Sequence, residues 1–303
     1  MKKKMFLMAL IATSMLYADD FYESNASVNL EETVISTTGF EEKTQNIIST
    51  VTVITSEDIS KKNYKTVVDV LSSVGTLNMT GNTVLGSTID LRGQGSRTRS
   101  NVQVLVDGVS LNSLDTEHGV FPFDSININT VERIEIISGG GAVVYGSGTS
   151  GGVINIITKN GFSSDKKISG TIGTEMGSYN SYTYKGNVIG QVTDNLQIGL
   201  DYLHGNSDNY REGSEYDKDN YGISLNYKID NNQKINFKYT KYTNDYSSPA
   251  VLTQAQLDKD RDGASTSETD YQADKDSYSL VYDYNMKDNL KFNLLSSYYN
   301  SVS

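Results

Sequence analysis

Residues 132–160 decide the fold of this chain, and they read ERIEIISGGGAVVYGSGTSGGVINIITKN. β-Branched residues alternate with other side chains at both ends of the stretch, a pattern that favours two strands. The glycines between these ends permit tight backbone turns. The chain before this stretch has the pattern of a small mixed α/β domain, and the chain after it changes to a series of polar and aromatic hairpins.

Gly146 to Gly151 also match the pattern G-x-G-x-x-G, which raises the alternative of a dinucleotide site. That fingerprint needs a helix that begins at the third glycine and an acidic residue about 20 residues further on. Here the glycines lead directly into Val153 to Ile157, whose pattern predicts a strand. We therefore interpret the glycines as a β-turn and not as a phosphate-binding loop.

The composition excludes several classes of function. A length of 303 residues predicts two domains. Cysteine is absent, which rules out disulfides, thiolate metal sites and cysteine nucleophiles. The net charge of −11 argues against nucleic acid as a partner. Only His118 and His204 are histidines, and their separation in sequence argues against a histidine-based metal site or catalytic triad.

The N-terminus has the pattern of a secretory signal peptide. Residues 2–4 are lysines, residues 5–16 form an apolar run, and Ala18 is suited to the position before cleavage. No apolar run reaches the about 18 residues of a membrane-spanning helix. We expect residues 1–18 to be removed, so that the mature chain begins near Asp19, outside the cytoplasm.

A short β-prone segment follows the polar residues 19–31. It consists of Glu32, Thr33, Val34, Ile35, Ser36 and Thr37. Such a segment is suited to strand addition, in which an extended peptide pairs with the sheet edge of another protein. The alternative is that it forms an ordinary first strand of the next domain.

The region over residues 47–123 has the pattern of alternating short elements. We expect strands over residues 47–54, 89–93 and 102–106, short helices over residues 57–59 and 64–72, and loops over residues 78–88 and 113–123. Thr55 or Ser56 caps the first helix. Asp107-Gly108 is a turn signal. We interpret Asp90 and Asp107 as strand-edge and turn residues and not as catalytic groups.

From about residue 167 onward, apolar and polar residues alternate with a period of two, which is the pattern of a β-strand with two different faces. In the segment over residues 221–229 apolar and aromatic residues alternate with polar ones, and residues 196–202, 278–286 and 290–298 repeat this pattern. Aromatic residues end each apolar run, as in transmembrane barrel strands. Short connections at residues 193–195, 230–233 and 287–289 contrast with long ones at 205–219 and 243–275, an asymmetry typical of outer-membrane barrels. A soluble β-sandwich is the alternative.

Residues 33–160 resemble the plug domain of TonB-dependent outer-membrane receptors. The matching motifs are, in order, Thr52-Val53-Ile54-Thr55, Leu91-Arg92-Gly93, Leu105-Val106-Asp107-Gly108, Arg133-Ile134-Glu135, Tyr145-Gly146-Ser147 and Gly151-Gly152-Val153-Ile154-Asn155-Ile156-Ile157-Thr158. One departure is visible, because Ser138-Gly139-Gly140 stands where the family commonly has Arg-Gly-Pro.

The resemblance implies a fold class and a domain order. We expect an α+β plug domain followed by part of an antiparallel transmembrane β-barrel: a signal peptide (1–18), a periplasmic extension with a TonB box at Glu32 to Thr37 (19–37), the plug (38–160) and barrel strands (161–303). About seven strands are present, whereas plugged barrels have about 22. The chain also lacks the terminal aromatic residue of family barrels, so we expect a fragment or a truncated product.

The resemblance further implies uptake of a scarce ligand across the outer membrane of a Gram-negative bacterium. The implied ligand is a ferric siderophore, with cobalamin as the alternative. The implied partners are TonB with its inner-membrane energising complex, outer-membrane lipid and the barrel-assembly machinery, and the receptor is expected to be a monomer. Loop position suggests ligand contacts at the plug apex, from Met79, Thr80, Gly81, Asn82, Asp115, Glu117 and His118.

No intrinsic cofactor is expected, and iron enters only as part of the ligand. Asp258, Asp260, Asp262 and Gly263 match the start of a calcium loop, but the twelfth position holds Thr269 instead of glutamate. The alternatives are a calcium site in an extracellular loop and a solvated acidic loop. Serine, histidine and carboxylate residues do not cluster in the sequence, so we expect no enzyme. An adhesion or structural barrel without transport, or a non-functional truncated fragment, stays open.

Overall fold

The computed structural model describes residues 33–34, 42–43, 50–83, 86–91, 101–111, 123–138, 149–159, 167–263, 268–287 and 290–302. The chain divides into two compact units, residues 1–32 and residues 33–303, and all described residues belong to the second unit. The predicted signal peptide and the first residue of the predicted TonB box, Glu32, therefore lie outside the described residues.

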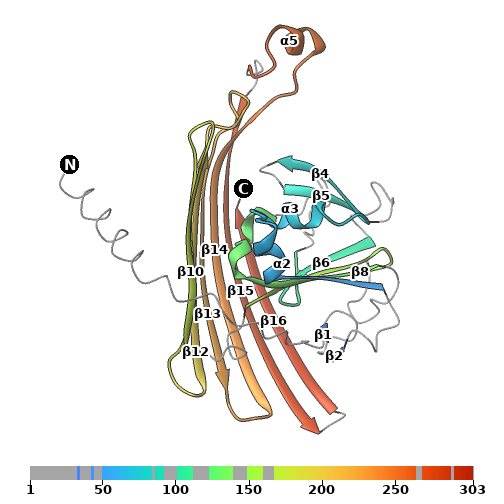
Figure 1. The fold of residues 1–303 in the computed structure, drawn as a ribbon, viewed down its shortest axis with the longest axis vertical. Coiled ribbons are helices and arrows are strands. Elements are labelled where there is room, and N and C mark those ends of the chain that lie inside the picture. Colours follow the sequence, from blue (N-terminus) through green and yellow to red (C-terminus); the bar gives the residue numbers. More distant parts are fainter. Residues whose placement is uncertain are drawn as a thin grey trace, which may run out of the picture. The chain divides into compact units, whose positions relative to one another are not determined.

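The N-terminal domain, residues 50–159, is built on a five-stranded sheet (Figure 1). Its order is β3 (Thr50–Thr55), β8 (Val131–Ser138), β9 (Gly152–Thr158), β6 (Val102–Val106) and β7 (Val109–Ser110). β6 and β9 are parallel, and all other neighbours are antiparallel. The two strands predicted at the ends of residues 132–160 thus pair side by side at the centre of the sheet. The glycine pattern leads into β9, as predicted, and not into a helix.

Two short helices begin where the sequence provides caps. The helices are α2 (Ser56–Lys61) and α3 (Val67–Ser72), and each begins after a threonine. The threonine side chain accepts a hydrogen bond from the backbone N–H of the aspartate three residues later. The side chain of that aspartate accepts one from the backbone N–H of the threonine, which completes the capping box. The second predicted helix therefore begins later than residue 64. Buried faces of the helices join the sheet in one apolar core that includes Val67, Leu71, Ile134 and Ile154.

The cap of α2 allows a prediction about stability and pH. Hydrogen bonds from Thr55 lower the pKa of the Asp58 carboxyl below its ordinary value of 3.8. A carboxylate with a lowered pKa stabilises the folded state above its unfolded pKa and loses this contribution as pH falls through the folded value. We expect Thr55→Ala to destabilise α2 by about 1 kcal/mol at pH 7.

This difference should shrink as pH falls below 3.8 and through the lowered pKa of Asp58 in the folded state, because the carboxyl then becomes protonated in both variants. Hydrogen exchange of residues 56–62, corrected for the intrinsic rate at each pH, measures both quantities. Ser60→Ala on the same helix is the control, because the Ser60 side chain is exposed and lies outside the capping box. A Thr55→Ala effect of the same size at pH 3 and pH 7 would contradict the explanation.

The segment predicted as a loop over residues 78–88 is instead a hairpin. β4 (Leu77–Thr83) and β5 (Gly86–Leu91) pair antiparallel, with a register shift between Thr80 and Thr83. The prediction was wrong because the segment is polar, while Leu77, Ile89 and Leu91 at its ends are buried in the core and bring the two strands together. Figure 1 shows α2 and α3 between this hairpin and the five-stranded sheet.

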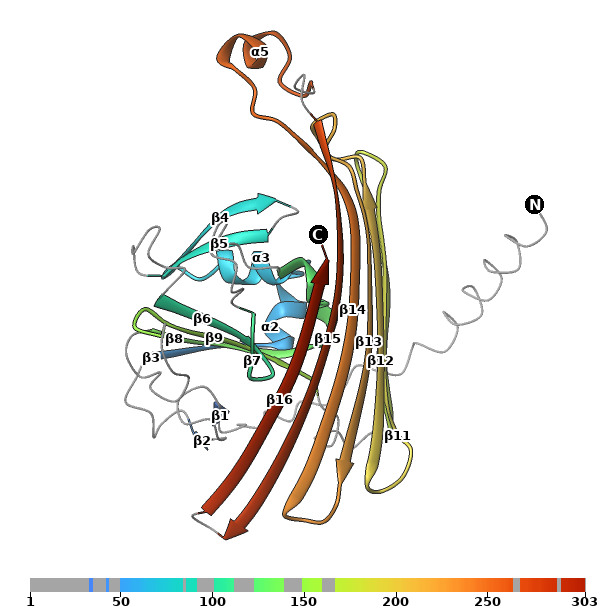
Figure 2. The same ribbon diagram turned by 180° about the vertical axis from the view of Figure 1, so that it is seen from behind.

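A seven-stranded antiparallel sheet makes up the rest of the described chain, and its strands follow one another in chain order (Figure 2). The strands are β10 (Ile168–Gly177), β11 (Ser181–Gln191), β12 (Leu196–Ser207), β13 (Tyr216–Lys228), β14 (Gln233–Pro249), β15 (Glu268–Lys287) and β16 (Leu290–Val302). The predicted seven strands are confirmed. The remaining elements are β1 (Thr33–Val34), β2 (Glu42–Lys43), the 3-10 turns η4 (Phe123–Ser125) and η5 (Ile128–Thr130), and α5 (Gln254–Lys259).

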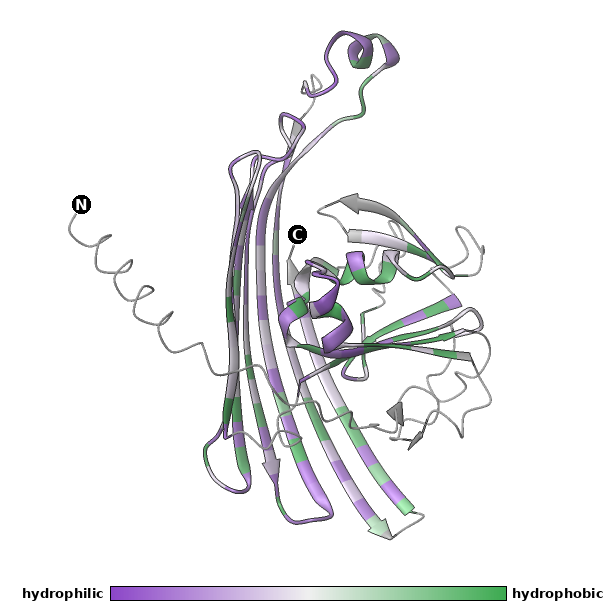
Figure 3. Cartoon of the chain, in the orientation of Figure 1, coloured by the Kyte–Doolittle hydropathy of each residue, from purple (hydrophilic) through white to green (hydrophobic). Residues whose placement is uncertain are grey.

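The two faces of this sheet differ in polarity, as the period of two predicts. Apolar and polar residues alternate over parts of these strands, such as residues 196–202 of β12 and 221–227 of β13, and Figure 3 shows bands of both kinds along the sheet. We call the face that carries Ile198, Leu200, Ile223 and Leu225 the apolar face, and these residues are half-buried or exposed. The opposite, polar face carries residues such as Gln197 and Asn226, which are buried and hydrogen-bonded to each other.

Tyrosines end the apolar face in rows. Tyr202 and Tyr221 are directly opposite each other, with ring centroids 5.1 Å apart, and Tyr239 and Tyr278 follow at 4.7 Å. Tyr227 lies six residues beyond Tyr221 on the same face, which corresponds to about 20 Å of strand. This spacing is close to the apolar band of about 25 Å in outer-membrane barrels.

The connections are shorter than predicted. β12 and β13 continue into the segment expected as a loop at residues 205–219, so that only residues 208–215 connect them. β14 and β15 likewise extend into the loop expected at residues 243–275, so that residues 250–267 connect them. The prediction was wrong because it ended each strand where apolar residues stop, whereas backbone pairing continues between polar residues. Tyr179 and Asn180, both at positive φ, form a tight turn between β10 and β11. None of the helices in the described part of the chain has the length and apolar character needed to cross a membrane.

Candidate functional site: polar contacts between the N-terminal domain and the sheet

Asp107 anchors the turn between β6 and β7. Asp107 and Gly108 both have positive φ, at 50° and 83°, as a two-residue hairpin turn requires. The Asp107 carboxylate accepts hydrogen bonds from the Thr158 backbone nitrogen (2.8 Å) and the Thr158 hydroxyl (2.7 Å). The predicted turn is confirmed, and its aspartate also binds the end of β9.

Lys238 of β14 reaches the same group from the polar face of the sheet. Its Nζ atom donates to Asp107 Oδ2 (3.1 Å) and to Thr158 Oγ1 (3.2 Å). The Lys238 and Asp107 side chains are each about one quarter exposed. This three-residue group, which we call the Asp107 cluster, joins the N-terminal domain to the sheet through a charge-assisted hydrogen bond.

Two more polar contacts join the same parts of the chain. Lys65, at the end of the α2–α3 connection, forms an ion pair with Glu175 of β10 at 3.0 Å. Asn220 of β13 donates to the backbone oxygen of Ser125 at 2.5 Å. Ion pairs and hydrogen bonds from three different strands thus connect the sheet to the N-terminal domain.

A small cavity adjoins the Asp107 cluster. It is lined by Thr130, Thr158, Lys159, Asp201 and Lys238, among others. Burial lowers the pKa of the Lys159 ammonium, while the nearby Glu132 carboxylate opposes this shift. Lys159 Nζ donates to the backbone oxygen of Asn129 at 2.8 Å. Charged side chains of the domain and of the sheet thus lie around one small cavity, which apolar residues such as Ile189 and Leu200 also line.

The predicted TonB box is described only in part. Thr33 and Val34 form β1, which pairs antiparallel with Lys43 and Glu42 of β2. Glu32, Ile35, Ser36 and Thr37 lie outside the described residues. Among the described residues, two residue pairs join β1 to β2.

The predicted apex residues fall into two groups. Met79, Thr80, Gly81 and Asn82 lie in β4, and the Met79 side chain packs against the core of the N-terminal domain. Asp115, Glu117 and His118 lie outside the described residues. The distance between the two groups is therefore not defined, and ligand contact at the apex stays a prediction.

The three aspartates of the predicted calcium loop lie at α5. Asp258 is in the helix and accepts from Gln254 Nε2 at 2.8 Å, and Asp260 is the C-cap. Asp262 follows two residues later. Calcium in this loop stays a prediction.

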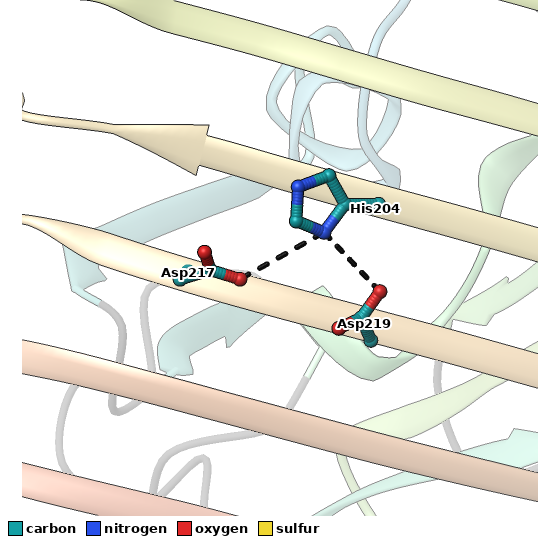
Figure 4. Close-up of side chains that lie close together, drawn as sticks. All are labelled: His204, Asp217 and Asp219. Carbon is teal, nitrogen blue, oxygen red and sulfur yellow. Dashed lines mark hydrogen bonds and ion pairs between the residues drawn. The ribbon is translucent and has the colours of Figure 1, made fainter. Parts of the chain in front are cut away.

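One charged group was missed by sequence reasoning. His204 of β12 lies beside Asp217 and Asp219 of β13, and both carboxylates point toward its ring (Figure 4). It is the one group among the described residues that brings three histidine or carboxylate ligand atoms within 4.8 Å of one another. The spacing of two residues between Asp217 and Asp219 indicated that both side chains lie on one face of a strand. Only the register between β12 and β13 places His204 beside them.

These features define a class of protein. An α+β domain joined by polar contacts to an antiparallel sheet, whose other face is apolar and ends in tyrosine rows, is the architecture of a plugged outer-membrane barrel. Residues 43–153 match the family model of the TonB-dependent receptor plug domain. Residues 43–153 are thus identified as a plug domain of the TonB-dependent receptor type, and the antiparallel sheet that follows resembles a section of the barrel.

Known proteins of this kind share sequence and fold with the chain. The vitamin B12 transporter BtuB of Vibrio vulnificus is 30% identical over 164 residues, which are 54% of this chain and 26% of the transporter. An iron-regulated outer membrane virulence protein of Vibrio cholerae is 32% identical over 160 residues, 49% of this chain and 23% of that protein. The chain thus aligns with about a quarter of the length of these relatives.

The fold comparison extends further along the chain. The unliganded ferric citrate transporter FecA superposes with a TM-score of 0.70 and 23% identity, over 84% of this chain and 40% of that one. The ferric yersiniabactin uptake receptor FyuA of Yersinia pestis gives a TM-score of 0.67 at 20% identity, over 84% and 41%. At this identity the likeness supports the fold, both for the plug and for the strands that follow it.

Proposed function

We propose that the protein takes up a scarce ligand across the outer membrane in a TonB-dependent manner. The ligand is a ferric siderophore, and cobalamin is the second candidate because the BtuB relative is a vitamin B12 transporter. The observation that carries the proposal is the polar attachment of the plug to the polar face of the sheet, through Asp107, Lys238, Lys65 and Glu175.

Polar attachment is suited to a plug that has to be remodelled. Exchanging a protein hydrogen bond for one to water changes the free energy by about 1 kcal/mol for neutral groups and about 1.5–3 kcal/mol for charged groups, because water replaces the partner. An apolar attachment would instead expose apolar area at about 25 cal/mol per Å². The contacts of Lys238 and Lys65 can therefore be exchanged for contacts with water while the core of the plug stays intact.

In this proposal, TonB acts on the segment Glu32 to Thr37. Thr33 and Val34 leave their two-residue pairing with β2 and pair instead with a strand of TonB. Force on the segment is then transmitted through the following residues to the plug. Export by the signal peptide and insertion into the outer membrane of a Gram-negative bacterium complete the proposal.

Deleting residues 32–37 tests this function. We expect uptake of radiolabelled ferric siderophore, or of labelled cobalamin, to fall at least tenfold, while binding of the same ligand to cells without energy is unchanged. Deleting residues 22–27, a polar segment of equal length, is the control and should leave uptake unaltered. Unchanged uptake without residues 32–37 would favour a barrel that does not transport, and absence of both uptake and binding in the unmodified protein would reject the proposal.

A further inference from the structure

His204, Asp217 and Asp219 lie on the apolar face, just beyond a row of tyrosines. His204 is directly opposite Asp219 in the pairing of β12 with β13, and it follows Tyr202 by two residues. Asp219 likewise stands two residues from Tyr221. The group therefore begins where the apolar band ends.

The distances within this group are compatible with the binding of a metal ion. His204 Nδ1 lies 3.2 Å from Asp219 Oδ1 and 3.7 Å from Asp217 Oδ1. Ligand atoms at about 2.0–2.2 Å from a tetrahedral zinc ion lie about 3.4 Å from one another. The two measured distances are on either side of this value, so an ion could enter with small side-chain movements.

Neighbouring tyrosines hold the ligands in place. Tyr202 Oη donates to Asp219 Oδ1 at 3.0 Å, which orients that carboxylate. The His204 ring stacks on Tyr184 at a centroid distance of 6.3 Å and an interplanar angle of 9°, and Tyr182 lies 5.6 Å away. Groups around the ligands that fix their orientation are a usual part of metal sites. All of these residues lie on paired strands, which position side chains more firmly than loops do.

The charge around the group supplies an independent reason for a cation. Asp217 is directly opposite Asp245 of β14, on the same face. Like charges at opposing positions of an antiparallel pair are destabilising. Three carboxylates thus lie at neighbouring positions of this face, and His204 is directly opposite one of them. A bound divalent ion would offset this excess of negative charge.

We propose that His204, Asp217 and Asp219 bind one divalent transition-metal ion of the zinc class. One imidazole nitrogen and two carboxylate oxygens suit this class better than calcium, which prefers oxygen ligands alone. The ion accepts the lone pair of Nδ1 in the tautomer whose hydrogen is on Nε2, and its remaining coordination positions face away from the sheet. The site is separate from the plug and from the proposed uptake function. The result of the zinc-binding test is therefore independent of the result of the uptake test.

Titration of the detergent-solubilised full-length protein with zinc chloride, monitored by calorimetry, tests the site. The protein must carry no polyhistidine tag. We expect one zinc ion per chain, and a dissociation constant at least tenfold higher in His204→Ala and in Asp219→Asn. Asp217→Asn should have a smaller effect, because Asp217 is farther from Nδ1 and more exposed. The control, Asp194→Asn, removes a carboxylate from a turn outside the group and should leave the constant unchanged.

The variants also separate a metal site from an ion pair. Asp219→Asn keeps the size of the side chain and an oxygen that accepts from Tyr202, so circular dichroism should stay as in the unmodified protein. Cobalt in place of zinc should give a visible absorption band that His204→Ala abolishes. Absence of zinc binding in the unmodified protein would show that the group is an ion pair only. Equal zinc affinity in His204→Ala and the unmodified protein would overturn the assignment.

Discussion

Gly152→Val should destabilise the plug by roughly 3–5 kcal/mol, more than the loss of a helix cap or of an ion pair. Gly152 begins β9 at φ +146°, a conformation that L side chains rarely adopt. A Cβ atom at this position would lie 2.3 Å from the backbone oxygen of Ile137 and 2.6 Å from Leu91 Cδ2. The oxygen belongs to β8, the neighbouring strand, so it cannot move without breaking the central pairing of the sheet.

Hydrogen exchange of residues 131–138 and 152–158 in the full chain measures this effect. The loss of stability corresponds to exchange that is on the order of a hundredfold faster or more in both strands. Gly75→Ala is the matched control, because a Cβ there would meet no atom within 4 Å. Exchange in Gly152→Val that stays within threefold of the unmodified protein would mean that the sheet can adapt, and would contradict the prediction.

Replacing Asp107 should loosen the plug from the sheet by about 1.5–3 kcal/mol, the usual range for hydrogen bonds to charged groups. Asp107→Asn is the suitable change, because asparagine tolerates the positive φ of this position. The variant removes the charge that attracts Lys238 Nζ at Asp107 and leaves Asp201 as the remaining nearby carboxylate for this partly buried ammonium. The asparagine Oδ1 atom still accepts the hydrogen bond from the Thr158 backbone nitrogen, so the β6–β7 turn should stay formed.

A double-mutant cycle with Lys238→Met isolates the contact. Exchange of residues 102–111 in the two single variants and in the double variant should give a coupling of about 1–2 kcal/mol. The matched control pair is Asp107→Asn with Lys234→Met, since Lys234 lies on the same face of β14 but contacts Asp283. Additive effects within about 0.5 kcal/mol for the Asp107–Lys238 pair would show that the ion pair contributes nothing to the attachment.

Local patterns in the sequence predicted most of the elements. The capping threonine of α2, the Asp107-Gly108 turn and the alternation in β12 and β13 all depend on residues close together in the chain, whereas the Thr66 cap of α3 was not predicted. The hairpin of β4 and β5 was missed because its central residues are polar. Its strands form because apolar residues at their ends reach the core, a consequence of packing that local polarity does not report.

The sequence by itself determined the two regimes of the chain, because strand period, turn glycines and helix caps act over a few residues. The tertiary structure alone decided which charges meet. Asp107 and Lys238 are 131 residues apart, and their contact exists only because the β6–β7 turn lies against the polar face of β14. His204 meets Asp219 because strand register places them opposite each other. Strand register and the position of the β6–β7 turn against the sheet depend on contacts between distant segments of the chain. A pattern over a few neighbouring residues carries no information about such contacts.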